Sequence, residues 1–233
     1  MPSNENTKQI KSRQRVADHG EVFTNPREVN AMLDLVRDES FRLDSRFLEP
    51  ACGDGNFLIE ILRRKLSLLQ DTKSQTEWEF QSLIAVGSCY GIDILPDNAE
   101  ACRTRLEEHV LSQHPASERL NARSADNTIK AQRSVVDESP YLLSLRYMLQ
   151  KNIVCGDALT YRTVEDKPIV FCEWTPIAGS LQFSRRDFQF DFLVTQSHQY
   201  SLFDEQGEAQ SFDEPVRTYP PLHYTQLYRY DTL

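Results

Sequence analysis

The segment that most constrains the fold is RFLEPACGDGNFLIEILRRKLSLL, residues 46–69, which predicts a short strand, a glycine turn and a helix in that order. Apolar side chains recur along its second half at the spacing of a helix with one buried face. The residues on this face are Phe57, Leu58, Ile61, Leu62, Lys65, Leu66 and Leu69. A strand that leads through a glycine turn into such a helix is typical of a parallel sheet covered by helices.

Helix and strand alternate on both sides of this segment. A helix is expected to begin at Pro26, capped by Thr24 or Asn25, because apolar residues follow at helical spacing. Residues 76–111 predict a helix, a short strand from Cys89 to Ile94 and a second helix. Such alternation favours an α/β domain whose parallel sheet has helices on both faces.

The second half of the chain is less regular. A helix is expected at 139–150 and further strands at 152–159 and 168–174, the last of them as the fourth strand of the sheet. Residues 112–138 are polar without a steady period and predict an exposed insertion. Beyond Pro176 the alternation stops, and only SLQFSRRDFQFDFLV suggests a hairpin arm, with its arginines solvated or paired to nearby acids.

These patterns predict three parts. A flexible basic arm would occupy residues 1–18, a main domain residues 19–176, and a hairpin with an irregular extension residues 177–233. The expected sheet is incomplete, because the strands that should follow the fourth one are hard to find after residue 176.

Composition agrees with a soluble globular protein: of 233 residues, 39% are hydrophobic and 26% charged, and no apolar run is long enough to span a bilayer. The first residues lack the apolar stretch of a secretory signal. The five cysteines are scattered, without a CxxC or Cys/His cluster, so we expect neither a metal site nor a disulfide framework. The cytoplasm is the expected compartment.

The net charge of −9 argues against a protein that binds DNA alone through its phosphates. The basic residues of the N-terminal arm form either a solvated tail or an arm that contacts nucleic acid or an acidic partner. These residues are Lys8, Lys11, Arg13 and Arg15.

Candidate ligand-binding residues gather where the strands are expected to end. Gly53 and Gly55 form either a simple tight turn or a turn that lets a ligand approach the backbone at the start of a helix. Glu49, Asp93 and Asp157 end three expected parallel strands, the edge where open α/β sheets bind ligands. Asp93 is suited to accept hydrogen bonds from both ribose hydroxyls of a nucleoside, and Asp157 from an adenine amino group.

Together these residues resemble the adenine-N6 DNA methyltransferases of restriction-modification systems, which belong to the class I S-adenosylmethionine-dependent methyltransferase superfamily. GEVFTNPREVNAML resembles motif X of that family, FLEPACGDGNFL motif I, YGIDILPDNAEACRTRL motif II and NIVCGDAL motif III. Asn25 is interposed in motif X, and Glu49 replaces the usual Asp of motif I. The resemblance covers roughly residues 20–159 and implies a Rossmann-like methyltransferase sheet.

The resemblance also implies S-adenosyl-L-methionine as cofactor, with Ile94 packed on its adenine. The cofactor-binding residues it implies are Phe23, Thr24, Glu49, Pro50, Ala51, Gly53, Gly55, Asp93, Ile94, Asp157 and Ala158.

The catalytic loop of the family is not recognisable in this chain. Motif IV, an Asp, Asn or Ser followed by Pro-Pro and an aromatic residue, should end strand four, where the chain reads CEWTP. The only Pro-Pro, in TYPPLHY, lacks the polar residue and the adjoining aromatic, so we interpret it as a polyproline turn.

Two interpretations of Glu173 and Trp174 remain open. As tentative catalytic residues, Glu173 would accept a hydrogen bond from the amino group of a flipped base and Trp174 would stack on that base. As structural residues, Trp174 would share a core face of the strand with Val170 and Cys172, and Glu173 would lie on the other face.

The expected function is an S-adenosylmethionine-dependent DNA methyltransferase of the adenine-N6 type, or the methyltransferase subunit of a restriction or defence complex. Residues 177–233 are too few and too irregular for a target-recognition domain, so a partner protein would supply DNA recognition. The alternative is a catalytically silent, cofactor-binding regulatory or structural subunit. A methyltransferase for RNA, protein or small molecules is a third option toward which no residue points.

Overall fold

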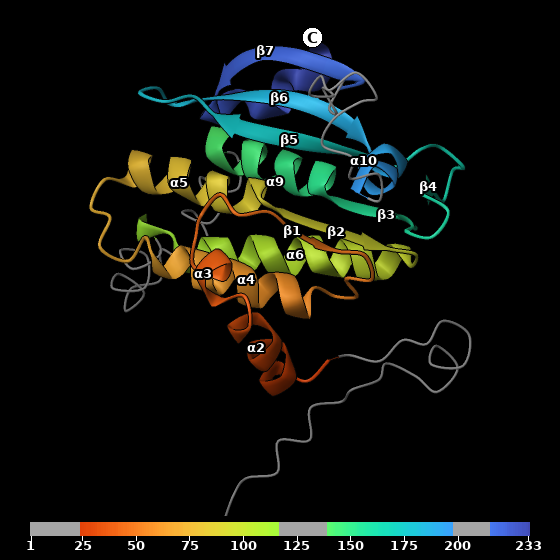
Figure 1. Ribbon diagram of the computed structural model, residues 1–233. Helices are drawn as coiled ribbons and strands as arrows, with labels where there is room; N and C mark the ends of the chain where they lie inside the picture. Colours follow the sequence, from red (N-terminus) through yellow and green to blue (C-terminus); the bar gives the residue numbers. More distant parts are fainter. Residues whose placement is uncertain (1–23, 117–138, 198–214) are drawn as a thin grey trace, which may run out of the picture.

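A computed structural model describes residues 24–116, 139–197 and 215–233 of the chain (Figure 1). Phe23, the basic arm with its four cations, and most of the polar insertion lie outside the described residues. Among the described residues the first helix is α2 (Pro26–Asp34), which begins at Pro26 as predicted. The side chain of Asn25 caps it by accepting a hydrogen bond from the backbone N–H of Arg27 at 2.9 Å.

The first sheet has four strands in the order β1-β2-β3-β4. Strands β1 (Phe47–Glu49), β2 (Cys89–Asp93) and β3 (Ile153–Asp157) are parallel, and the short β4 (Arg162–Thr163) is antiparallel to β3. Every residue of β2 is buried, as expected for a strand with neighbours on both sides and helices nearby. The predicted α/β class is confirmed, with a mixed sheet.

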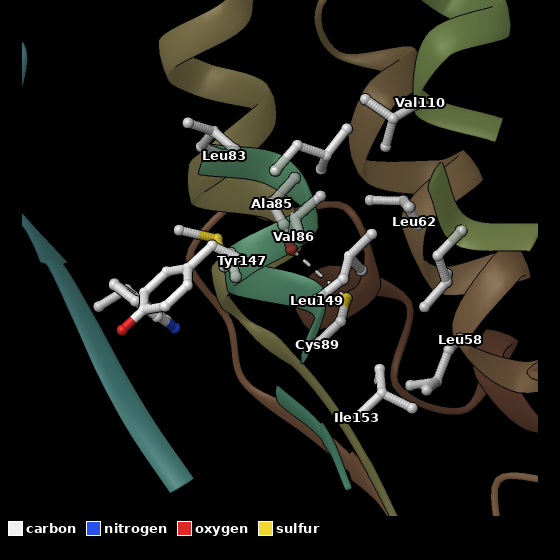
Figure 2. Packing of buried hydrophobic residues seen from close by; sticks show 14 of the residues in the cluster. Leu58, Leu62, Leu83, Ala85, Val86, Cys89, Val110, Tyr147, Leu149 and Ile153 are labelled. Atoms are coloured by element: carbon white, nitrogen blue, oxygen red, sulfur yellow. Dashed lines mark hydrogen bonds between the residues drawn. The ribbon is translucent and has the colours of Figure 1, made fainter. Parts of the chain in front are cut away.

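Helices cover both faces of this sheet (Figure 1). On one side lie α4 (Asn56–Ser67) and α6 (Pro96–Gln113), and on the other α5 (Gln75–Gly87) and α9 (Pro140–Asn152). The short helix α3 (Arg37–Ser40) follows α2, and both contact α4. Figure 2 shows part of the core, in which side chains of these helices meet those of β2 and β3; the labelled residues are Leu58, Leu62, Leu83, Ala85, Val86, Cys89, Val110, Tyr147, Leu149 and Ile153.

Lys65 lies on the buried face of α4, as the helical spacing of the apolar residues around it predicts. Its side chain is fully buried, and its ammonium donates hydrogen bonds to the carbonyl oxygens of Leu43, at 3.3 Å, and Ser45, and to the hydroxyl of Ser88. A buried ammonium is tolerated only when such partners replace its water. Burial lowers the pKa of Lys65. Lys65 therefore fixes the segment before β1 to the segment before β2.

A second sheet is antiparallel and has the order β5-β6-β7. It contains β5 (Val170–Pro176), β6 (Gln182–Gln189) and β7 (Arg217–His223), and α10 (Phe190–Ser197) follows β6 directly. The prediction that residues 168–174 form the fourth strand of the parallel sheet is therefore wrong. A parallel return usually runs through a helix, whereas residues 158–169 contain no helix and hold β4 and turns.

The end of the chain is also more regular than predicted. Pro220 and Pro221 belong to β7, not to a polyproline turn. Proline cannot donate to a neighbouring strand, so it is tolerated where one side of a strand is free, and β7 is one of the two edge strands of the described sheet. The 3₁₀ helix η1 (Tyr224–Thr232) then packs on α9.

A small apolar cluster joins the two sheets. Tyr90 and Ile92 of β2 meet Ile169, Phe171 of β5 and Phe190 of α10. None of the helices in the described ranges has the length and apolar character needed to cross a membrane.

Candidate functional site

Three carboxylates lie at one edge of the first sheet. Glu49 ends β1, Asp93 ends β2 and Asp157 ends β3. In the strand register Glu49 pairs with Gly91, and Asp93 pairs with Cys155. The end of β2 therefore lies two residues beyond the end of β1, and the end of β3 two residues beyond the end of β2. The predicted position of these side chains at the carboxyl ends of adjacent parallel strands is confirmed.

The glycine turn between β1 and α4 has the backbone that its sequence suggests. Gly53 (φ 54°) and Gly55 (φ 93°) both adopt left-handed conformations, which are costly for other residues. A Cβ atom on Gly55 would lie 2.7 Å from the sulfur of Cys102 on α6. Close packing of α6 against the turn therefore requires glycine at this position whether or not a ligand binds, a constraint that the sequence pattern did not reveal.

Asp93 organises this turn. Its Oδ2 accepts a hydrogen bond from the Gly53 N–H at 2.8 Å, and its Oδ1 accepts bonds from the Leu95 N–H at 2.9 Å and the Asn98 side-chain amide at 3.2 Å. A carboxylate oxygen accepts about two hydrogen bonds. Of the two oxygens, Oδ2 keeps room for one more donor, so Asp93 can hold one ribose hydroxyl while the turn is intact. The sequence predicted hydrogen bonds from both ribose hydroxyls.

The carboxylates of Glu49 and Asp157 accept fewer hydrogen bonds than that of Asp93. Among the residues that the structure describes, Glu49 accepts one hydrogen bond, from the Ala51 N–H at 3.3 Å, and Asp157 accepts one, from the Leu159 N–H at 2.8 Å. Burial raises the pKa of Glu49, against the lowering effect of the Ala51 bond. Both carboxylates therefore retain acceptor positions for the hydroxyl, amino or ammonium groups of a ligand.

The apolar residues beside the carboxylates face outward. Ile94, next to Asp93, is 49% exposed, and Leu159, two residues after Asp157, is 88% exposed. Pro50 and Ala51 are exposed in the turn, and Ala158 is half-buried. This edge of the sheet thus combines acceptors with uncovered apolar side chains, which suits a ligand that has both a flat apolar part and hydrogen-bond donors.

Arg105 of α6 is a component of this site that sequence reasoning missed. Its guanidinium donates to the Asp54 carbonyl at 2.7 Å and to the Asn56 side-chain oxygen at 3.1 Å, and it also pairs with the Asp54 carboxylate at 2.7 Å. Asn56 in turn donates to the carbonyl of Thr24 at 3.4 Å. The arginine therefore joins the glycine turn to α6, and Asn56 joins it to the segment before α2.

Glu173 and Trp174 lie at the other end of the sheet. Glu173 forms an ion pair with Arg46, which precedes β1, at 2.9 Å. Trp174 donates a hydrogen bond to the side chain of Asn152, which precedes β3, at 2.9 Å. The strands of the first sheet separate this end from the glycine turn by about 15 Å, too far for either residue to hold a base against a ligand bound at that turn.

The surroundings of Glu173 and Trp174 are also those of structural residues. Glu173 binds Arg186 of β6 as well as Arg46, and its side chain is 13% exposed. Trp174 is buried among the rings of Tyr147 and Tyr230. The interpretation of Trp174 as a core residue is confirmed, and both carboxylate oxygens of Glu173 are engaged by arginines.

The arginines of the FSRRDFQF stretch were predicted to be either solvated or paired to nearby acids, and the structure shows both of them paired to acids. Arg186 binds Glu173, and Arg185 binds the carboxylate of Asp187 with two nitrogens, each at 2.7 Å. Arg185 is buried against four aromatic rings, the closest being Tyr219 at 4.4 Å. Arg185 is thus part of the core, not of a surface that binds nucleic acid.

All five cysteines are free thiols, and within the described ranges no group of three or more His, Cys, Asp or Glu side chains is placed to hold a metal ion. Comparison of the chain with models of known protein families, with curated proteins and with solved structures found no match.

Proposed function

We propose that the chain binds S-adenosyl-L-methionine at the carboxyl edge of β1, β2 and β3, in a Rossmann-like methyltransferase sheet, and serves as the methyltransferase subunit of an adenine-N6 DNA methylation or defence complex. S-adenosylmethionine would supply an activated methyl group. The arrangement of Glu49, Asp93 and Asp157 around the turn at Gly53 and Gly55 is the observation that carries this proposal.

The donors and acceptors of this edge fit the chemistry of the cofactor. Of the polar groups of S-adenosylmethionine, the ammonium, the sulfonium, the two ribose hydroxyls and the adenine amino group favour acceptors or negative charge, whereas its carboxylate favours donors. The open acceptor of Asp93 would hold one ribose hydroxyl, Glu49 would face the cationic methionine part, and Asp157 with Ala158 would receive the adenine edge. The exposed side chain of Ile94 would cover one face of the adenine.

Pro50 and Ala51 would contribute backbone contacts in the turn, and Thr24 would close the site from the segment before α2. The hydrogen bond from Asn56 to the Thr24 carbonyl supports this role, because it fixes that segment beside the glycine turn. The resemblance also implies Phe23, which lies outside the described residues.

The second candidate is a catalytically silent subunit that binds the cofactor for a regulatory or structural purpose. The engagement of Glu173 by two arginines and the burial of Trp174 favour it, because the segment that the sequence offers as the base-binding loop is used for packing. In either case DNA recognition, and for the second candidate the chemistry, would come from a partner protein.

Two measurements test these candidates. Titration calorimetry of the full chain with S-adenosylmethionine should give one saturable site of micromolar affinity, and no heat of binding would refute both candidates. Transfer of a labelled methyl group to mixed-sequence DNA, with and without the proteins of neighbouring genes, then separates them. Label in the N6 position of adenine supports the methyltransferase subunit, whereas cofactor binding without any incorporation supports the silent one.

A further inference from the structure

A pocket of about 380 Å³ lies away from the proposed cofactor site, between the open edge of β1 and the second sheet. Its size is within the range of small-molecule sites in proteins, roughly 300–1,000 Å³. Its walls are mainly Phe47, Leu48, Tyr90, Phe171, Phe188 and Phe190.

The walls offer flat apolar surface. The rings of Tyr90 and Phe171 meet edge to face at 5.3 Å, and those of Phe171 and Phe190 at 5.5 Å, so the rings hold one another in place. The Tyr90 hydroxyl donates to the Cys172 carbonyl at 2.9 Å and is therefore already satisfied. Tyr90 and Phe171 are only 8% and 5% exposed, so they form a rigid apolar floor against which the ring of a ligand would pack.

The edge of β1 adds a backbone donor and an acceptor. The Phe47 N–H donates to the Ser88 carbonyl at 2.9 Å, which directs the backbone groups of Phe47 and Glu49 toward β2. In a parallel strand pair the residue between them turns its N–H and C=O the other way. Leu48 therefore presents both groups toward the pocket side of β1, where none of the described strands pairs with it.

Charged side chains of both signs lie at the pocket: Arg46 and Glu173 line it, and Arg186, which is not part of the lining, also binds Glu173. Arg46 and Arg186 both bind the carboxylate of Glu173, so two guanidinium groups surround one carboxylate. Arg46 lines the pocket, is 65% exposed and uses one terminal nitrogen on Glu173, which leaves its remaining donors accessible to a ligand. A cationic ligand would meet a neutralised Glu173 and an excess of positive charge, whereas an anion would complete the pairing of Arg46.

We propose that this pocket binds a small aromatic anion, whose rings lie against Tyr90 and Phe171 and whose anionic group binds Arg46. The site is independent of the proposed cofactor site, because it opens beside the amino end of β1 and shares no residue with the glycine turn. The anionic group of the natural ligand can be a carboxylate or a phosphate, since Arg46 recognises either one.

Anilinonaphthalene sulfonate is a suitable probe, because it is an aromatic anion whose fluorescence rises in apolar surroundings. We expect the full chain to bind it at one saturable site. Arg46→Gln should weaken this binding roughly tenfold, the loss expected for one charge-assisted hydrogen bond. Arg42→Gln is the matched control, because Arg42 is similarly exposed, pairs with Glu39 and Asp44, and does not line the pocket.

Phenylnaphthylamine, which has the rings without the anionic group, separates charge from packing. Its affinity should be the same for the parent protein and Arg46→Gln, whereas Leu193→Trp, which places a large ring in the pocket, should weaken both probes. Circular dichroism of each variant checks that the fold is retained. Unsaturable binding of the anionic probe, or equal affinity for it in Arg46→Gln and Arg42→Gln, would overturn the proposal.

Competition identifies the anionic group and keeps this test separate from the cofactor. Displacement of the probe by naphthoate or by naphthyl phosphate supports the site and shows which anion it prefers; failure of both to displace it contradicts the site. S-adenosylmethionine should leave the probe in place, and displacement by the cofactor would assign the probe to the carboxyl edge instead. Arg46→Gln should bind S-adenosylmethionine as the parent protein does, if the parent binds it.

Discussion

The indole nitrogen of Trp174 donates a hydrogen bond to the side-chain oxygen of Asn152 at 2.9 Å, and both residues are buried. The amide nitrogen of the same Asn152 donates to the carbonyl of Cys89 at 3.1 Å, with Val86 and Gly87 carbonyls at slightly greater distances. One asparagine thus connects the second sheet, the end of α5 and the start of β2. The tryptophan that a base-binding loop would have used instead holds the two sheets together.

Trp174→Phe is therefore expected to lower the free energy of unfolding by about 1–3 kcal/mol, because it leaves the buried Asn152 oxygen without its donor. Denaturant unfolding of Trp174→Phe, Asn152→Ala and the double variant measures the coupling between the two side chains. We expect the double variant to lose clearly less than the sum of the single variants. Fully additive losses would show that the hydrogen bond does not connect the sheets.

Gly55→Ala is expected to cost about 2–5 kcal/mol of stability, from left-handed backbone strain and from overlap with the Cys102 sulfur. Gly179→Ala is the matched control: Gly179 also has a positive φ, of 71°, but a Cβ there would meet nothing within 4 Å. It should cost only about 1–2 kcal/mol. Thermal unfolding would compare the two, and Cys102→Ala should partly rescue Gly55→Ala if overlap contributes.

Asp93→Ala is expected to weaken S-adenosylmethionine binding by about 1–3 kcal/mol, the contribution of a charge-assisted hydrogen bond. It should also destabilise the fold, because Asp93 holds the Gly53 and Leu95 amides.

Asp157→Ala separates these two effects, since Asp157 accepts a single local hydrogen bond within the described structure. We expect its affinity for the cofactor to fall while its melting temperature stays close to that of the parent. Calorimetry and thermal unfolding of both variants provide the comparison; unchanged affinity in both would mean that the cofactor binds elsewhere or not at all.

A buried carboxylate predicts a loss of stability in acid. Glu79 of α5 accepts hydrogen bonds from Tyr224 at 2.8 Å, Gln75 at 2.7 Å and His114 at 3.1 Å. Burial alone would raise the pKa of Glu79, but the bonds from His114, Gln75 and Tyr224 outweigh it and lower the pKa. The charged carboxylate therefore stabilises the fold fully above the ordinary glutamate pKa, and this stabilisation disappears as the pH falls through the lowered value.

Glu79→Gln should reduce the free energy of unfolding at neutral pH by about 1–3 kcal/mol and should flatten its decline below about pH 4. Urea unfolding at several pH values measures both effects. Glu77→Gln, an exposed change on the same helix, should leave the pH dependence of the parent intact. If Glu79→Gln and the parent lose stability in parallel as the pH falls, another carboxylate governs the acid response.

Features that depend on nearby residues were predictable from the sequence. The periodicity of residues 57–69 identified α4 and even placed Lys65 on its buried face, because each turn of a helix repeats the same local geometry. The sequence also predicted a cap at Thr24 or Asn25 for α2, because capping depends on the residues next to the helix start. It placed the three carboxylates at strand ends, because the end of an apolar run marks the end of a strand.

The partners of β5 were not predictable in this way. An apolar strand has the same local pattern in either sheet, so the sequence of residues 168–174 could not say which neighbours it pairs with. A turn that contains the left-handed Gly179 connects β5 to β6. The resulting hairpin pairs seven residues of β5, from Val170 to Pro176, with β6, so β5 belongs to the antiparallel sheet.

By itself, the sequence determined the strand, glycine turn and helix around Gly53, and the placement of acidic residues at strand ends, because local spacing fixes both. Only the tertiary structure decided that Gly55 must be glycine to admit Cys102, and that Glu173 meets Arg46 at the far end of the sheet. Both contacts join residues far apart in the chain, and the packing of whole helices and sheets determines which distant residues meet.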